Sequence, residues 1–149
     1  MVSHSFLLEQ GRWRLEGNWL ERSNPPIALT GRIIVAWGQD NWYSMVTKLT
    51  FPNRERQEIT CQYRGRLDGG ERQYTFVLQH SELGRVEGEG WITPAAIVQR
   101  YWTLNDKQRR SGFETLTRLD TGKYAISGGM MAGLHLTSAM DATLILQYS

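Results

Sequence analysis

The feature that most constrains this chain is a series of short segments in which apolar and polar residues alternate, each followed by turn-forming residues. Successive side chains of a β-strand point to opposite faces, so this alternation predicts strands with one apolar face. We predict strands over residues 12–20, 28–37, 42–51, 57–64, 73–79, two within 83–104, then 110–119, 124–128 and 134–148, the last stretch forming one long strand or two short ones.

The connections between these segments are short, which favours successive hairpins over crossing connections. A meander of this length exposes two sheet edges unless it closes on itself, and glycines within the strands can supply the necessary bends. Residues 3–10 predict a short helix with Ser3 or Ser5 as its N-cap. We therefore predict an all-β protein, a single antiparallel up-and-down β-barrel of about eight to ten strands with a short N-terminal helix, as one domain over residues 1–149.

Composition excludes several classes of protein. The formal net charge is +2 and the charges are scattered, so we expect no nucleic-acid partner. No stretch approaches the roughly 20 apolar residues of a membrane-spanning helix. The lone Cys61 excludes an intrachain disulfide and fits a reducing cytoplasm, where we expect the protein to be located. His4, His80 and His135 lie far apart in the chain, so we expect neither a metal site nor a cofactor.

Residues 83–104 are the most informative stretch, because they predict a hairpin that turns at residues 93–96. A loop of two or four residues there places Glu89 opposite Arg100 and Glu87 opposite Trp102. One face of this hairpin then combines charged and aromatic side chains, namely Glu87, Glu89, Trp91, Val98, Arg100 and Trp102.

The loop before this hairpin decides which way that face points. A five-residue loop over 80–84 places Tyr74 and Phe76 on one face with Gly88 and Gly90, so the charged face points outward. A four-residue loop over 81–84 points the charged face into the barrel, because a shift of one residue flips every side chain. Aromatic rings over glycines pack well, which favours the outward arrangement, and both arrangements stay open.

The inward arrangement would form a ligand site. The planar guanidinium of Arg100 suits a ligand carboxylate, with Glu89 holding it in place. The aromatic walls of this predicted site are Trp91, Trp102, Tyr74 and Phe76. The outward arrangement would instead give an exposed ion pair that contributes under about 1 kcal/mol.

Acid–base catalysis by Glu87 and Glu89 is disfavoured, because Glu-x-Glu is common in strands. We therefore predict no catalytic residue and leave open whether the protein is an enzyme, with binding preferred.

The opening of the first strand, Gly11-Arg12-Trp13 after an apolar turn, resembles that of the calycin superfamily, the barrels of lipocalins and fatty-acid-binding proteins. The segment from Phe6 to Trp13, together with Gln99-Arg100-Tyr101-Trp102, is also similar to the cyanobacterial lipocalin-like phycobiliprotein lyases. The chain departs from lipocalins in having only a short loop after the first strand. The resemblance implies binding of a small hydrophobic or amphipathic molecule inside the barrel.

The leading functional hypothesis is therefore non-catalytic binding of a small hydrophobic or amphipathic anionic ligand inside the barrel, with Arg100 as anchor. One alternative is a chaperone or lyase for a tetrapyrrole (bilin) that acts on a partner protein. The other is a structural or interaction module whose barrel is filled by side chains. A homodimer is left open.

Overall fold

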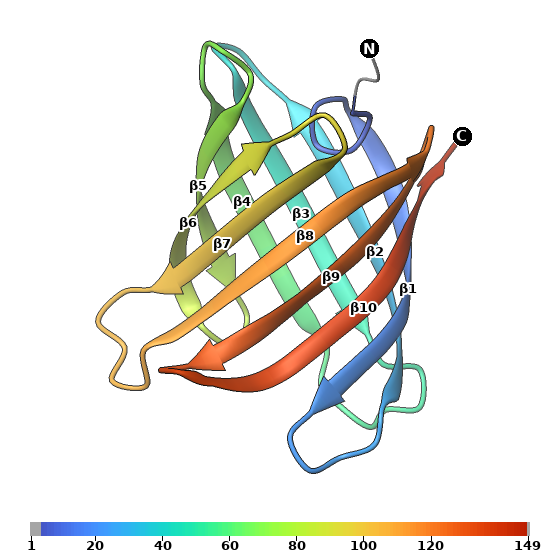
Figure 1. Cartoon of the computed structure of the whole chain (residues 1–149), viewed down its shortest axis with the longest axis vertical. Helices are drawn as coiled ribbons and strands as arrows, with labels where there is room; N and C mark the ends of the chain where they lie inside the picture. Colours follow the sequence, from blue (N-terminus) through green and yellow to red (C-terminus); the bar gives the residue numbers. More distant parts are fainter. Residues whose placement is uncertain (1–3, 149) are drawn as a thin grey trace.

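The computed structural model describes residues 4–148 and contains ten antiparallel strands in one closed barrel (Figure 1). Each strand pairs with its neighbours in sequence, and the first strand pairs with the last. This confirms the predicted all-β up-and-down barrel. The strands are β1 (Gly11–Glu21), β2 (Ile27–Trp37), β3 (Trp42–Thr50), β4 (Ile59–Leu67), β5 (Gln73–His80), β6 (Gly84–Ile92), β7 (Ala96–Thr103), β8 (Arg110–Asp120), β9 (Lys123–Ala132) and β10 (His135–Gln147).

Closure depends on the long last strand. β10 runs unbroken beside β1 from the Arg12–Gln147 pair to the Glu21–Ser138 pair, so neither strand is left as an edge. Its register with β9 shifts between Leu136 and Ser138, a local bulge at the end of the barrel where β9 turns into β10. Of the two alternatives for residues 134–148, the single long strand is the one observed.

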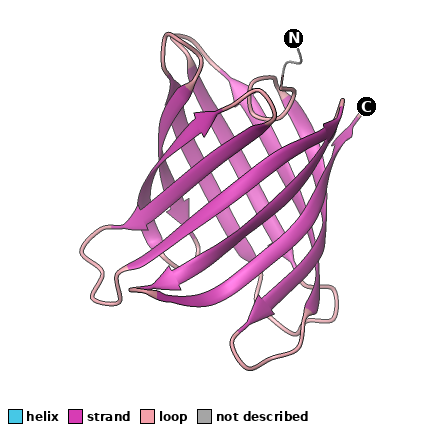
Figure 2. Ribbon diagram, viewed as in Figure 1, coloured by secondary structure: helices cyan, strands magenta, loops and turns pink. Residues whose placement is uncertain are grey.

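The predicted N-terminal helix is wrong, since residues 4–148 contain no helix (Figure 2). The segment after residue 4 forms a tight turn in which the Leu8 amide donates to the Phe6 carbonyl at 2.8 Å. Phe6 and Leu7 are buried across one end of the barrel, and the Trp37 indole N–H donates to the Leu7 carbonyl at 2.8 Å. These contacts with the barrel outweigh helix propensity in so short a segment. Ser3, a predicted N-cap, lies outside the described residues.

The N-terminal segment is also held by a buried histidine. His4 Nδ1 lies 2.6 Å from the Tyr124 hydroxyl on β9, and His4 Nε2 lies 2.7 Å from the Thr93 carbonyl. With Nε2–H donating to that carbonyl, Nδ1 accepts from the tyrosine. The segment therefore closes this end of the barrel, which also carries the turn between β6 and β7.

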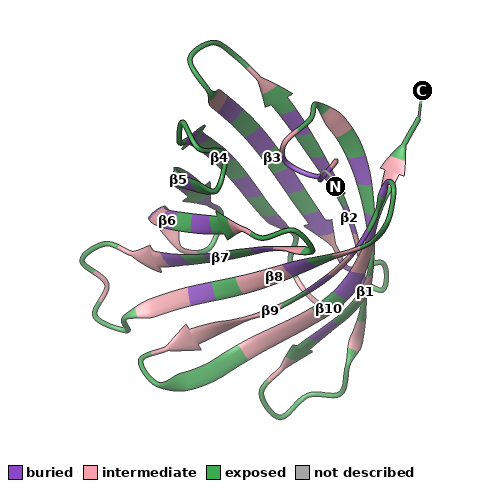
Figure 3. Cartoon of the chain, turned by 45° about the horizontal axis from the view of Figure 1, so that its top comes forward, coloured by how far each residue is buried: buried purple, intermediate pink, exposed green. Residues whose placement is uncertain are grey.

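The interior of the barrel is apolar along most strands. β3, β4 and β5 alternate between buried and exposed residues along their length (Figure 3). Toward their shared turn, β9 and β10 lose this alternation, and successive residues there are half-buried or exposed. This difference between the two sides of the barrel locates the candidate site.

Candidate ligand-binding site

The hairpin of β6 and β7 has the predicted register, with Glu89 opposite Arg100 and Glu87 opposite Trp102. Its orientation follows from the β5–β6 pairing, in which Phe76 faces Gly88 and Tyr74 faces Gly90. Strand pairing continues to His80 and Gly84, so the turn holds residues 81–83 and has the parity of the five-residue loop. The outward arrangement is therefore the one observed.

The charged and aromatic face of the hairpin consequently lies on the outer surface. Arg100 and Glu89 are exposed, Trp91 is 58% exposed, and Trp102 is half-buried. The Arg100 guanidinium lies 5.5 Å from the centre of the Trp102 ring, an exterior cation–π contact. The hypothesis that Arg100 anchors a ligand inside the barrel is wrong in its geometry, and so is the interior placement of Glu89, Trp91 and Trp102.

Packing of rings on glycines explains this orientation. The rings of Phe76 and Tyr74 lie directly over Gly88 and Gly90, where a Cβ atom on either glycine would overlap the ring. The four-residue loop would instead pair Phe76 with Glu89 and Tyr74 with Trp91, and that packing would be lost. Of the predicted site residues, Tyr74 and Phe76 therefore lie inside the barrel, where both are buried.

A cavity of about 70 Å³ remains inside the barrel. It extends from Phe6 of the N-terminal segment toward the opposite end, where Met130 and Met140 contribute to its wall. Most of its lining is aliphatic or aromatic. The polar side chains that line it are Thr47, Cys61, Tyr63, His80, Gln99, Tyr101, Glu114 and Ser138.

Three of the interior polar groups form a directional chain across β5, β7 and β8. The Tyr74 hydroxyl donates to Gln99 Oε1 at 2.7 Å, and Gln99 Nε2 donates to Glu114 Oε1 at 3.1 Å. Because the tyrosine donates to the amide oxygen, the amide presents its N–H to the carboxyl group. The chain therefore ends at Glu114, whose side chain lines the cavity.

Glu114 is held among groups that offer it no positive charge. Its strand neighbours are Gln99 on β7 and Gly128 on β9, and a Cβ atom on Gly128 would lie 2.9 Å from Glu114 Cγ. The glycine therefore gives the carboxyl side chain its room. Burial raises the pKa of Glu114, and the hydrogen bond from Gln99 offsets this only in part.

Sequence inspection missed Glu114, although a signal for it was present. The residue alternates with Gly112 and Leu116 in a predicted strand, and Leu116 is an obvious inward residue. The same parity assigns Glu114 to the interior, where an unpaired carboxyl is unusual enough to mark a site.

The other titratable groups of the cavity stay protonated and uncharged. Burial raises the pKa of the Cys61 thiol to about 12, so it is no nucleophile. Burial likewise raises the pKa values of Tyr63, Tyr74 and Tyr101. These side chains can offer hydrogen bonds to a ligand but no charge.

His80 closes the cavity wall at the end of β5. Its Nδ1 accepts hydrogen bonds from the backbone N–H groups of Glu82 and Leu83, at 3.0 and 3.2 Å. Burial lowers the pKa of His80, which favours the neutral ring. With Nδ1 occupied as an acceptor, the ring proton resides on Nε2, so this histidine is arranged to donate rather than to ligate a metal. Within residues 4–148 no group of three or more His, Cys, Asp or Glu side chains could hold a metal ion.

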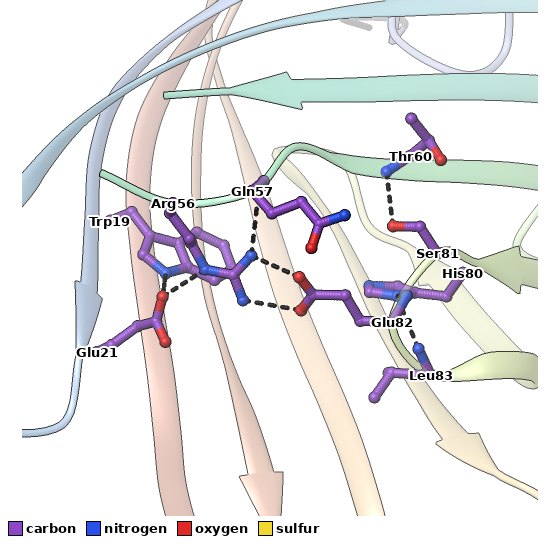
Figure 4. Close-up of polar contacts among 9 residues, drawn as sticks. All are labelled: Trp19, Glu21, Arg56, Gln57, Thr60, His80, Ser81, Glu82 and Leu83. Atoms are coloured by element: carbon purple, nitrogen blue, oxygen red, sulfur yellow. Dashed lines mark hydrogen bonds and ion pairs between the residues drawn. The ribbon is translucent and has the colours of Figure 1, made fainter. Parts of the chain in front are cut away.

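Arg56, from the loop between β3 and β4, bridges several residues at one half of the barrel end beyond His80 (Figure 4). Its Nε donates to Glu21, and its terminal nitrogens donate to both carboxylate oxygens of Glu82 at 2.6 and 2.8 Å. The guanidinium also lies 5.0 Å from the Trp19 ring centre and 5.6 Å from that of Phe51. We call these five residues the Arg56 clasp; it joins the end of β1, this loop and the β5–β6 turn.

The other half of this end is open. Gly128 and Met130 on β9, and Ser138 and Met140 on β10, continue the inward-facing rows of buried residues, yet all four are half-buried rather than buried. All four line the cavity. We call them the open half; it adjoins the clasp through the Ser138–Glu21 strand pair. Inward-facing side chains that solvent reaches mark the entrance to the cavity.

The comparisons with known proteins concern the fold. No protein-family model matches the chain, and no curated protein matches it in sequence. A crystal structure of Rv2717c from M. tuberculosis is similar, with a TM-score of 0.72, 14% identity, and coverage of 93% of this chain and 92% of that one.

The S-type phycobiliprotein lyase CPES from Guillardia theta is also similar, with a TM-score of 0.65, 12% identity, and coverage of 94% of this chain and 89% of that one. No helix within residues 4–148 is long and apolar enough to cross a membrane. Together with the closed ten-stranded meander, these likenesses show that the chain has a calycin-like fold of the lipocalin type.

Proposed function

We propose that the protein binds a small, mainly apolar molecule in the barrel cavity, without catalysis, and that the ligand enters through the open half. One observation carries this proposal: four residues that continue inward-facing rows are only half-buried, namely Gly128, Met130, Ser138 and Met140. At the opposite end Phe6 and Leu7 of the N-terminal segment are buried, and beside the open half the Arg56 clasp joins three segments. A barrel with no ligand would gain stability by filling this half with larger side chains.

The nature of the lining supports a binding protein rather than an enzyme. Ligand sites combine an apolar wall with a few placed polar groups, and this cavity has that composition. Its thiol is protonated, and its one carboxyl lies beside an amide and hydroxyls rather than a base. Nothing in this set forms an activated nucleophile.

The ligand we propose differs from the one first expected. Among residues 4–148 no Lys or Arg side chain lines the cavity, and Glu114 does. An anion would meet this carboxyl with no balancing charge, so the anionic part of the initial hypothesis has no support inside the barrel.

The direct test is to purify the protein from its own host and record its native mass spectrum. We expect a population heavier than the bare chain by the mass of one small organic molecule, which solvent extraction then releases. A bare chain in repeated preparations would contradict the proposal and would favour a barrel filled by its own side chains.

Handling of a bilin is the second candidate, because a structural neighbour is a phycobiliprotein lyase. The cavity of about 70 Å³ admits only an edge of so large a molecule, so the rest would lie across the open half. The same preparation separates the two candidates. A visible absorption band that follows the protein would favour the bilin, and a colourless extract would favour the small apolar ligand.

A further inference from the structure

We propose that Glu114 selects the ligand of this cavity for a protonated amine, held as an ammonium–carboxylate pair with its small aliphatic body against the methionines of the open half. This inference rests on the proposed function and specifies the chemistry of the same site. Four features of the interior lead to it.

The first feature is the free side of the carboxyl group. Glu114 Oε1 accepts the hydrogen bond from Gln99, and within residues 4–148 no hydrogen bond or ion pair to Oε2 is formed. The side chain lines the cavity, so this oxygen is available to a molecule inside it. Glu114 is half-buried, so water reaches this oxygen, and a ligand that carries a hydrogen-bond donor would replace that water.

The second feature is the direction of the hydrogen-bond chain. Tyr74 donates to Gln99, and Gln99 donates to Glu114, so the chain ends in an acceptor. Gln99 is itself buried and fixed by both partners, and it cannot turn its oxygen toward the cavity without losing them. The chain therefore requires a hydrogen-bond donor from the ligand rather than an acceptor.

The third feature is the charge balance. The titratable groups that surround Glu114 are Cys61 and Tyr63 on β4, Tyr74 and His80 on β5, and Tyr101 on β7, and none of them carries a charge at neutral pH. Each of these side chains lines the cavity or bonds to the chain that ends at Glu114. A cationic ligand would supply the missing counter-charge, whereas a carboxylate would place a second negative charge beside Glu114.

The fourth feature is size. A cavity of about 70 Å³ is under half the roughly 150 Å³ of an engineered apolar cavity that holds benzene. The body of the ligand, or the part that enters, therefore has only a few carbon atoms. Met130 and Met140 flank the entrance and are flexible enough to pack around such a group.

The experiment uses three probes of one shape: isobutylamine, isobutanol and isobutyrate, which carry an ammonium, a hydroxyl and a carboxylate at neutral pH. Binding is read from the ¹³C-methyl NMR signals of the methionines. Met45, Met130 and Met140 line the cavity, whereas Met131 does not and serves as an internal control.

We expect isobutylamine to shift the cavity methionines and to bind at least about tenfold more tightly than isobutyrate, since hydrogen bonds to charged groups have about this effect. The Glu114→Gln variant should lose this preference, because it puts an amide N–H where the free carboxyl oxygen lay. The comparison within the unaltered protein does not depend on how the variant folds.

The possible failures can be told apart. If isobutanol and isobutylamine both leave the cavity methionines unshifted, the proposed function fails. If isobutanol binds but isobutylamine is no tighter than isobutyrate, or if Glu114→Gln keeps the preference for the amine, the amine proposal fails and the proposed function stands.

Discussion

The two halves of one barrel end are built in opposite ways. In the Arg56 clasp, a side chain that is 17% exposed bridges two carboxylates with its guanidinium and packs against two aromatic rings. It joins three segments distant in sequence. In the open half, glycine, serine and methionine continue the inward-facing rows, yet all four residues are only half-buried. An ion-pair and aromatic network therefore joins the segments on one side of this barrel end, and the other side has no such network among the described residues.

The largest effect is expected from removing the clasp. Arg56→Ala should lower the free energy of unfolding by about 2 kcal/mol, because it leaves Glu21 and Glu82 without their partner and removes two cation–π contacts. Denaturant unfolding measures this change. Arg64→Ala is the matched control, since Arg64 lies 4.8 Å from the Trp42 ring centre on the exposed outer face. Equal losses in the two variants would show that the clasp contributes nothing of its own.

Closing the open half should instead affect binding. Ser138→Phe puts a ring at the entrance, and we expect the affinity for isobutanol to fall at least about tenfold, as when an apolar pocket is filled. Ser127→Phe is its control, because Ser127 is exposed on the outer face of β9. Titration of the methionine methyl signals measures both. Unchanged affinity in Ser138→Phe would mean that the ligand enters elsewhere.

The stability of the protein should depend on pH through His80, which lies next to the clasp residue Glu82 in the β5–β6 turn. Because burial lowers the pKa of His80, the folded state disfavours the protonated ring. The contribution of His80 to the free energy of unfolding should therefore be fully present above pH 6.5, the ordinary histidine pKa. It should be lost as the pH falls through the lower pKa that His80 has in the folded state. His80→Asn keeps an acceptor for the turn and should flatten this part of the stability profile. A profile as steep as that of the unaltered protein would contradict the assignment.

The smallest effect is expected at Glu114 and has the opposite sign. Burial raises the pKa of Glu114 above its ordinary value of 4.5. Its contribution to the free energy of unfolding is therefore fully present below pH 4.5 and is lost as the pH rises through the raised pKa. Glu114→Gln should therefore be more stable than the unaltered protein at neutral pH and gain less at acid pH. The test is thermal unfolding at a series of pH values, and a variant less stable at neutral pH would show that the carboxylate is paired.

Local patterns predicted most of the fold. The barrel, the order of its strands and the Glu89–Arg100 register follow from alternation and turn residues, which act over a few neighbours. The N-terminal helix was wrong because Phe6 and Leu7 are fixed by contacts with residues far along the chain. Propensity carries no information about such contacts.

The candidate site was harder to predict than the fold. The orientation of Arg100 depended on the parity of one turn, and the rings of Tyr74 and Phe76 over glycines decided it. Glu114 could have been assigned to the interior by its parity with Leu116. That its free oxygen reaches a cavity depends on Gln99 and Gly128 from the two neighbouring strands, which no single segment of sequence reveals.

The most direct test of the central claim, that a ligand reaches the interior through the open half, is a crystal structure of the protein under xenon pressure. Xenon occupies apolar cavities that it can enter. We expect a xenon atom beside Met130 and Met140 in the unaltered protein and none there in Ser138→Phe. A barrel interior free of xenon in the unaltered protein, or one equally occupied in both, would contradict the account.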